Sequence, residues 1–171
     1  QMDHFNWGVC GANALTTSSS VCAKNVSQDI SGKMFTDEAC TAETSDFAAA
    51  LYGDIAYWAT QGAWRLPTQA ELQKLYNEAS YQYGYYTTED GKNVYGYLFT
   101  PPMKSGRVEN TSARQITDEE LVGGLFLPAT GYRIYPGSTI SKSGEVGYYW
   151  TSQYRSAGDN DYAYYLELQP T

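Results

Sequence analysis

The C-terminal third of the chain reads GLFLPATGYRIY over residues 124–135, GYYWTSQYR over 147–155 and DYAYYLEL over 161–168. Each run is rich in Tyr, Phe, Trp and Leu, and the segments between them are polar and contain Gly, Ser and Asp. Short aromatic runs separated by turn-forming residues are typical of antiparallel strands. We therefore expect these three runs to form an antiparallel meander.

The last run alternates between two faces. Such alternation predicts a strand with one buried side, here Tyr162, Tyr164, Leu166 and Leu168 opposite Ala163, Tyr165 and Glu167. Eight of the 17 tyrosines lie between residues 124 and 168, more hydroxyl groups than a core needs. Because tyrosine joins a large apolar ring to a polar tip, it suits contact surfaces. The stretch therefore predicts a sheet whose connections present a binding surface.

Composition and charge narrow the classes of function. A chain of 171 residues is long enough for one domain with its own core. The net charge of −8 argues against nucleic acid and anionic membranes as partners, and no apolar run is long enough to insert into a membrane. A low charge density with many Tyr, Thr, Ser, Asn and Gly residues is typical of extracellular bacterial binding domains. We expect a secreted or cell-surface protein.

All three cysteines, Cys10, Cys22 and Cys40, lie in the first quarter of the chain. Their spacing does not fit a zinc site, and His4 is the single histidine. We expect two of them to form a disulfide that holds a loop-rich segment, 1–44. Within it, the polar run 14–32 should make few core contacts. Three reduced thiols are the alternative.

The middle of the chain predicts two helices. An apolar stripe from Phe47 to Trp58 predicts a first helix ending near Gly62, with a possible break at Asp54 as a second N-cap. The sequence 67–71, PTQAE, is a capping box in which Thr68 and Glu71 exchange hydrogen bonds, so a second helix begins there and runs towards Ala79.

A hairpin and a long loop follow. Residues 81–102 are aromatic with a turn at Glu89–Lys92, which predicts two paired strands. Residues 103–123 are polar and charged, and we expect a long excursion there.

Little in the chain suggests catalysis. One histidine near the terminus argues against a nucleophilic triad. Carboxylate groups at 118–120, or Asp159 and Asp161, fit a glycosidase by type alone. The sequence Asp159-Asn160-Asp161 could hold a structural calcium ion, but it also fits a turn, which we favour. No other cofactor is expected.

Four blocks in order resemble a known family. They are a turn into a helix followed by three strand-like runs: WRLPTQAELQKL (64–75), LFLPATGYR (125–133), GEVGYYWTS (144–152) and AYYLEL (163–168). This pattern resembles the bacterial C-type-lectin-like domains of the paralogous group found in Fibrobacter and Bacteroidetes secreted proteins. That group is distantly related to formylglycine-generating enzymes and similar to the variable proteins of diversity-generating retroelements.

The resemblance implies a fold more than an activity. Formylglycine-generating enzymes need a cysteine pair near the end of the chain, and no cysteine follows Cys40, so that activity does not carry over. Calcium-binding sugar lectins use EPN or QPD and WND motifs, and this chain has Trp150-Thr151-Ser152 instead. Variable proteins end in a Tyr-, Asn-, Asp- and Ser-rich segment, and residues 154–162 have that composition.

We expect an α+β, C-type-lectin-like fold: two helices packed on a twisted, mostly antiparallel sheet with long irregular loops, residues 45–171 forming the ligand-binding domain. The expected function is that of an extracellular adhesin-like module, such as a retroelement variable protein or a pilus-tip adhesin, that binds a protein or glycan without catalysis. The alternatives are a carbohydrate-active enzyme and a structural pilin or surface module. The expected ligand-binding residues are Tyr135, Tyr154, Arg155, Ser156, Asp159, Asn160, Asp161 and Tyr162. The residues expected to be buried are Trp64, Leu66, Leu72, Phe126, Leu127, Trp150 and Leu166.

Overall fold

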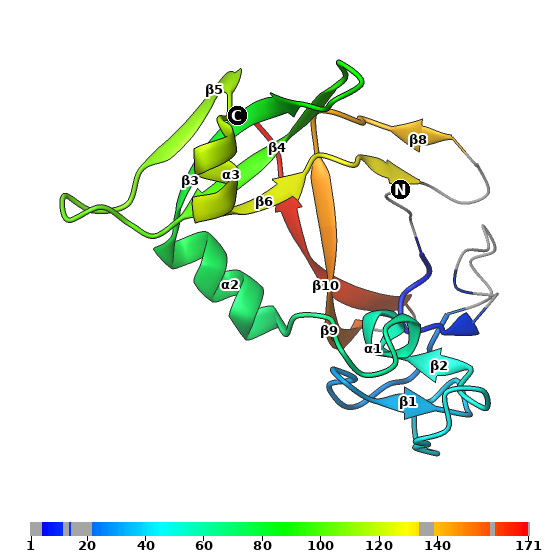
Figure 1. The fold of residues 1–171 in the computed structure, drawn as a ribbon. Helices are drawn as coiled ribbons and strands as arrows, with labels where there is room; N and C mark the ends of the chain where they lie inside the picture. Colours follow the sequence, from blue (N-terminus) through cyan, green and yellow to red (C-terminus); the bar gives the residue numbers. More distant parts are fainter. Residues whose placement is uncertain (1–4, 12–13, 15–21, 134–138, 158–159, 171) are drawn as a thin grey trace. The chain divides into compact units, whose positions relative to one another are not determined.

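A computed structural model gives the fold, and it describes residues 5–11, 14, 22–133, 139–157 and 160–170, without the side chains of 156–157 and 160–162. The chain is α+β with short helices and mostly antiparallel strands (Figure 1). The elements are β1 (Met34–Phe35), β2 (Tyr52–Gly53), α1 (Ile55–Ala59), α2 (Gln69–Glu78), β3 (Ser80–Thr87), β4 (Asn93–Thr100), β5 (Glu109–Gln115), α3 (Asp118–Gly123), β6 (Leu125–Pro128), β7 (Tyr132–Arg133), β8 (Ile140–Ser141), β9 (Gly147–Ala157) and β10 (Asn160–Leu168).

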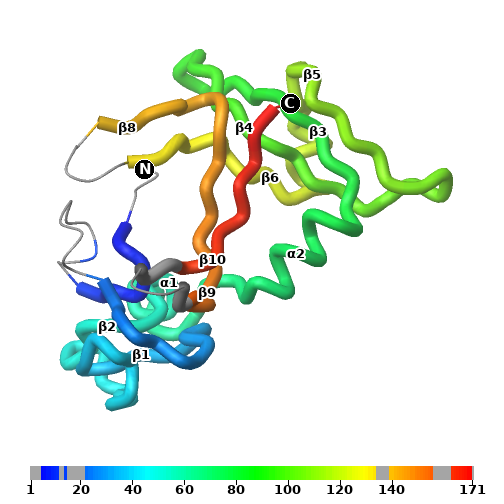
Figure 2. The backbone as a smooth tube through the Cα atoms, turned by 180° about the vertical axis from the view of Figure 1, so that it is seen from behind, coloured from blue at the N-terminus to red at the C-terminus, as the bar shows by residue number. Residues whose placement is uncertain are grey.

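The chain divides into two compact units. The N-terminal unit comprises residues 1–71, 134–138 and 150–165, and the sheet unit comprises 72–133, 139–149 and 166–171. The boundary expected at residue 44 falls inside the N-terminal unit. Strands β9 and β10 pair with one another, run side by side in Figure 2, and contribute residues to both units.

The sheet unit is built on four strands in the order β5-β3-β4-β6. Strands β3 and β4 form the expected antiparallel hairpin, with Ser80 opposite Thr100 and Thr87 opposite Asn93. Strand β6 pairs with β4, and β5 lies parallel to β3. Helix α3 lies on one face of this sheet, in front of the strands in Figure 1 and behind them in Figure 2.

The prediction of a three-stranded meander is wrong for the first of its three strands. The run containing residues 125–128 joins the hairpin as β6, so that Leu127 lies opposite Tyr97 and Leu125 opposite Phe99. Strand β4 is buried from Gly96 to Phe99, and its second edge needs a partner for its backbone N–H and C=O groups. The remaining runs form the β9–β10 pair alone.

Tyrosines of the sheet unit form its core. Tyr83 and Tyr97 are buried together with Phe99, Ala129 and Leu168. The Tyr83 hydroxyl donates to the carbonyl of Gly144 at 2.8 Å, and the Tyr97 hydroxyl donates to the carbonyl of Glu145 at 3.2 Å. Burial raises the pKa of both tyrosines. Within the C-terminal third, the Tyr149 hydroxyl likewise donates to the carbonyl of Pro128, so the tyrosines of that stretch do not all mark a binding surface.

The segment 103–123 is more regular than expected. It contains β5 and α3, and α3 begins with a second capping box in which Thr117 and Glu120 exchange hydrogen bonds. Arg114 donates to both carboxylate oxygens of Glu120, and this contact lowers the pKa of Glu120 to about 2. The long irregular excursion predicted from the sequence is thus limited to the residues before β5.

The N-terminal unit has its own apolar core, which the segment 1–44 largely supplies. The buried members are Trp7, Ala23, Val26, Ile30, Phe35 and Cys40, with Tyr52, Trp150, Tyr154 and Ala163 packed against them. The Trp7 indole N–H donates to the carbonyl of Thr151 at 2.7 Å. The expectation of few core contacts in the run 14–32 is therefore wrong, because Ala23, Val26 and Ile30 are buried there. Small and β-branched residues placed singly among polar neighbours carry no periodic signal.

Asp54 joins three parts of this unit. It is fully buried, and its Oδ1 atom accepts from the N–H groups of Ala56 and Tyr57 at 2.9 and 3.0 Å, which caps α1. Its Oδ2 atom accepts from the N–H groups of Gly32 and Leu66, both at 2.8 Å. The predicted break at Asp54 is confirmed, and the single helix from Phe47 to Gly62 is wrong. Residues 52–53 are drawn into β2, which pairs with β1.

The capping box of α2 is confirmed. The Glu71 N–H donates to the Thr68 hydroxyl at 3.2 Å, and the Thr68 N–H donates to the Glu71 carboxylate at 2.9 Å. The Arg65 guanidinium binds the same carboxylate through both of its oxygens. These hydrogen bonds lower the pKa of Glu71 to about 2.

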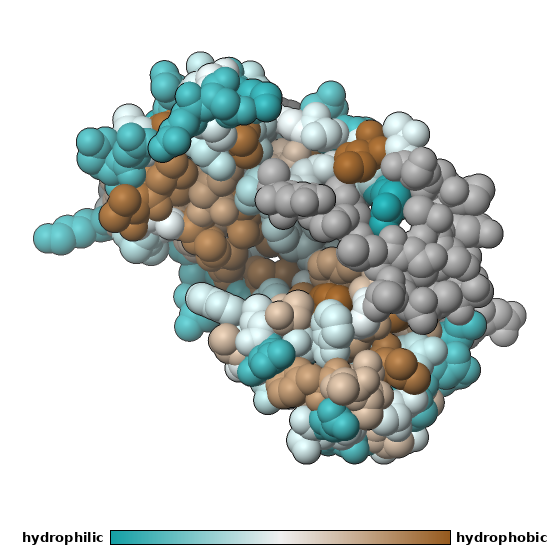
Figure 3. All heavy atoms as spheres, turned by 45° about the vertical axis from the view of Figure 1, so that its right-hand side comes forward, coloured by the Kyte–Doolittle hydropathy of each residue, from teal (hydrophilic) through white to brown (hydrophobic). Residues whose placement is uncertain are grey.

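The burial expected from the sequence is only partly correct. Leu66 is buried, whereas Leu72, Phe126, Leu127, Trp150 and Leu166 are half-buried. Trp64 is 73% exposed. It lies between α1 and α2, so its ring is on no apolar helix face, and its backbone N–H donates to the Thr60 hydroxyl. In Figure 3, apolar residues (brown) gather in the upper left, over the sheet unit. Val122 and Leu125 of that unit are exposed.

The expected disulfide is not formed. Cys10, Cys22 and Cys40 are thiols in the structure, and Cys10 and Cys40 are buried. Burial raises the pKa of both buried thiols to about 12. Disulfide formation needs a thiolate, and burial disfavours that charged form at both positions. Apolar packing, rather than a cross-link, holds this segment.

Replacing Asp54 with Ala leaves four backbone N–H groups, one buried and three partly buried, without their acceptor. Each such loss costs about 1–3 kcal/mol, so we expect Asp54→Ala to lower the free energy of unfolding by more than about 3 kcal/mol. Urea denaturation followed by circular dichroism measures the change. Asp46→Ala is the matched control, because exposed Asp46 also accepts a backbone N–H, from Ala48, and it should cost less than about 1 kcal/mol. Equal losses in the two variants would contradict the role of Asp54.

The thiols give a second test. A thiol assay of the unfolded chain without reductant should count all three cysteines. In the folded chain, Cys10 and Cys40 should react on the order of a thousandfold more slowly than in the unfolded chain, because burial raises the pKa of each thiol to about 12 and reaction requires the thiolate. A count of one thiol in the unfolded chain would show that the other two cysteines form a disulfide.

Candidate functional site

Six of the eight predicted ligand-binding residues lie in β9 or β10. Strand β9 extends to Ala157 and β10 begins at Asn160, so the connection expected over 153–161 is mostly strand. Tyr135 and Asp159 lie outside the described residues, and the side chains of Ser156, Asn160, Asp161 and Tyr162 are not described. Tyr154 and Arg155 are the predicted residues that can be placed in full.

Tyr154 and Arg155 have different surroundings. Tyr154 is half-buried, packs against the core of the N-terminal unit, and its ring centre lies 5.8 Å from that of Trp7. Arg155 is exposed, and its guanidinium carbon lies 5.8 Å from the centre of the Tyr164 ring. A cation over an aromatic face is attracted by the ring quadrupole. Tyr154 therefore contributes to the fold as well as to the surface.

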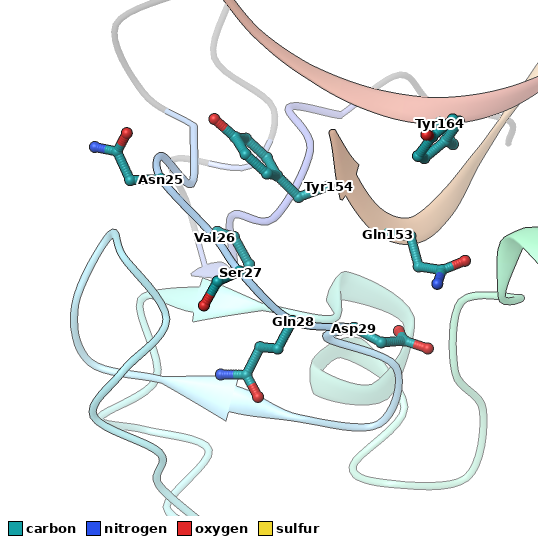
Figure 4. Close-up of a pocket in the computed structure, with 8 residues that line it drawn as sticks. All are labelled: Asn25, Val26, Ser27, Gln28, Asp29, Gln153, Tyr154 and Tyr164. Atoms are coloured by element: carbon teal, nitrogen blue, oxygen red, sulfur yellow. The ribbon is translucent and has the colours of Figure 1, made fainter. Parts of the chain in front are cut away.

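A hollow adjoins Tyr154 within the N-terminal unit (Figure 4). It has a volume of about 440 Å³, which is within the range of small-ligand sites, about 300–1,000 Å³. Two segments far apart in the sequence line it: residues 25–29 on one side, and Gln153, Tyr154 and Tyr164 of β9 and β10 on the other. The strands thus supply the aromatic rings, and the N-terminal segment supplies most of the polar groups.

Backbone contacts fix the two segments against one another. Asp29 and Gln153 form an antiparallel bridge, and the Ile30 N–H donates to the carbonyl of Ser152 at 3.1 Å. The Ser152 N–H donates to the carbonyl of Pro67 at 2.9 Å. Val26 within the lining segment and Ile30 directly after it are buried in the core, so the polar residues of 25–29 are held at the surface.

Several polar side chains of the hollow are oriented by bonds within the chain. The Gln153 Oε1 atom accepts from the N–H of Gln69, the first residue of α2, at 2.9 Å. The Asp29 Oδ1 atom accepts from the Ser31 N–H at 2.9 Å. Gln28 donates to the carbonyl of Cys40 and accepts from the Lys33 ammonium at 3.0 Å. These side chains are held in place before any ligand arrives, which lowers the entropy cost of binding.

The charge of the hollow is small. Asp29 is the charged residue among the eight that line it. Arg65 lies outside the lining and forms an ion pair with Glu71 at 2.7 Å. Among the described residues, no cluster of three or more His, Cys, Asp or Glu side chains is placed to hold a metal ion.

Residues 25–29 were not predicted as part of a site. Their sequence, NVSQD, is polar, and Val26 and Ile30 are its apolar positions. A spacing of four between single apolar residues fits a loop as well as a strand, so no local pattern reveals the segment. Its role follows from pairing with β9, which lies more than 100 residues away along the chain.

No family model, curated protein or solved structure matches the chain. Within the described part of the chain, none of the helices has the length and apolar character required to span a bilayer.

The packing of Tyr154 gives a test of its structural role. Because its ring contacts Trp7 and the core, we expect Tyr154→Ala to lower the free energy of unfolding by about 2 kcal/mol, less than full burial would give. Arg155→Ala should cost less than about 1 kcal/mol, since Arg155 is exposed. Thermal and urea denaturation measure both. A Tyr154→Ala variant as stable as the parent chain would place this ring on the surface alone.

Proposed function

We propose that the chain is an extracellular ligand-binding module and that the hollow in the N-terminal unit is its binding site. The observation that carries the proposal is the convergence of two distant segments on one preformed, partly aromatic hollow beside Tyr154. Tyrosines joined by fixed amide and carboxylate groups suit recognition, because the rings supply contact area and the polar groups supply direction.

The proposal is binding rather than catalysis. A glycosidase uses two carboxylic acids across the scissile bond, whereas the hollow is lined by one, Asp29. Two carboxylates with a strongly lowered pKa, Glu71 and Glu120, each take part in a capping box and are held by an arginine. Their perturbation is explained by the fold. The alternative of a carbohydrate-active enzyme therefore has less support.

The structural-module alternative also has less support. An assembly module needs a strand edge that accepts another chain. Of the two edges of the sheet, β5 reads ENTSARQ, which is polar and includes Glu109 and Arg114. The other edge, β6, reads LFLP and is a short strand that ends in Pro128, which has no N–H group to donate. Charged side chains on an edge strand discourage pairing with a second chain.

We further propose a C-type-lectin-like fold for residues 45–171. The four sequence blocks support it, as do the helix that follows Leu66-Pro67 and the pairing of the YYWTS and AYYLEL strands. A retroelement variable protein or a pilus-tip adhesin is the specific role proposed, with the Tyr-, Asn- and Asp-rich segment 154–162 at the end of the β9–β10 pair. A reverse-transcriptase gene with a template repeat beside the coding sequence would support the first of these roles.

Tyr164 and Tyr165 offer a matched pair for testing the site. They are neighbours in β10, but Tyr164 lines the hollow while Tyr165 points to the other face and is 49% exposed. After a ligand is identified on glycan and protein arrays, Tyr164→Ala should weaken capture by about thirtyfold, as for an aromatic hot spot. Tyr165→Ala should leave capture within about threefold of the parent.

Melting temperatures show whether each variant is folded. Full capture by a folded Tyr164→Ala variant would move the site away from the hollow. If the parent chain captures no arrayed glycan or protein, the binding function itself is contradicted.

A further inference from the structure

The hollow offers both a hydrogen-bond donor and an acceptor in fixed positions. Since Gln153 Oε1 already accepts from Gln69, the remaining group of this amide is its NH₂ donor. Since Asp29 Oδ1 accepts from Ser31, Oδ2 is its available acceptor; it has no hydrogen-bond partner among the described residues. In Figure 4 the two side chains extend to the same side of the hollow.

Hydroxyl groups are the ligand groups that match this pair. Each hydroxyl is at once a donor and an acceptor, so neighbouring hydroxyls of one molecule can donate to Asp29 and accept from Gln153. The Ser27 hydroxyl, also part of the lining, adds a group of the same dual character. The rings of Tyr154 and Tyr164 complete the lining with apolar area, against which the C–H groups of a polyol ring can pack.

Charge argues for a neutral ligand. The Asp29 carboxylate lines the hollow, and two positive side chains contact the lining, Lys33 beside Gln28 and Arg155 over Tyr164. The Arg65 guanidinium also interacts with the charge of Asp29. Charges of both signs therefore surround the hollow and offset one another, so neither an anion nor a cation meets charges of the opposite sign alone.

Direct contact is favoured over contact through a calcium ion. Calcium takes six to eight oxygen ligands and usually several carboxylates. The hollow provides a single carboxylate, and one of its oxygens is occupied by a backbone N–H.

We propose that the hollow binds a neutral saccharide directly, through Asp29, Gln153 and the two tyrosines. This inference rests on the ligand-binding function proposed above and names its ligand class. The volume of about 440 Å³ suits a terminal mono- or disaccharide unit, within the usual size of small-ligand sites.

The chain is first screened on an array of neutral oligosaccharides. Four neutral disaccharides are then titrated into the whole chain and followed by calorimetry: cellobiose, xylobiose, lactose and N,N′-diacetylchitobiose. We expect at least one to bind and Asp29→Asn to weaken it about tenfold, because a carboxylate is a stronger acceptor than an amide. The fold should survive this change, since the side-chain amide keeps an oxygen that can accept from the Ser31 N–H. Asp46→Asn, an exposed aspartate outside the lining, is the matched control and should leave binding unchanged.

Salt and chelator distinguish the ligand classes. Binding of a neutral saccharide should change less than about twofold between about 50 and 500 mM NaCl, because no net charge is screened, and should be unaffected by EDTA. Loss of binding in EDTA would overturn direct contact. An array hit that is anionic and binds more tightly to the Asp29→Asn variant would overturn the neutral class.

The two proposals fail in different ways. If arrayed proteins are captured through Tyr164 while no neutral saccharide binds, the ligand class is wrong and the binding function stands. If neither saccharides nor proteins are captured, both proposals are overturned. Saccharide binding that is lost in Trp64→Ala and kept in Asp29→Asn would place the sugar at the exposed indole, outside the hollow.

Discussion

The buried carboxylate of Asp54 is the constraint on which the N-terminal unit depends. It accepts four backbone N–H groups from three separate parts of the chain, so it starts α1, fixes the turn at Gly32 and fixes the chain at Leu66. Leu66 precedes Pro67, whose carbonyl receives the Ser152 N–H of β9. The hydrogen bonds of this one side chain therefore help to place β9 beside residues 25–30. The hollow lies between these two segments and depends on the same bonds.

Local signals in the sequence predicted what local interactions determine. The capping box at Thr68 and the turn at Glu89–Lys92 were correctly placed, because each is complete within a few residues. The same box pattern at Thr117–Glu120 was available and would have predicted α3. The partner of the strand at 125–128 was not predictable, since its choice between β4 and a local meander depends on which edge is vacant in the sheet.

The sequence predicted one of the two walls of the candidate site. Composition drew attention to the end of β9, and Tyr154 does line the hollow. The opposite wall, residues 25–29, has no signature because polar lining residues resemble any solvated loop. Tyrosine content was also ambiguous: Tyr83 and Tyr97 serve the core, where carbonyls satisfy their hydroxyls, and sequence alone does not separate them from surface tyrosines.

The contact between Trp7 and Tyr154 has an optical consequence. The ring of buried Trp7 lies tilted beside a ring that lines the hollow, at 5.8 Å between centres. Of the other three tryptophans, Trp58 and Trp150 are half-buried and Trp64 is 73% exposed. A buried indole emits at shorter wavelength than one in water, so Trp7 contributes to the blue edge of the fluorescence spectrum and Trp64 to its red edge. The blue edge therefore includes an intrinsic signal from the wall of the hollow, while the red edge serves as an internal reference within the same chain.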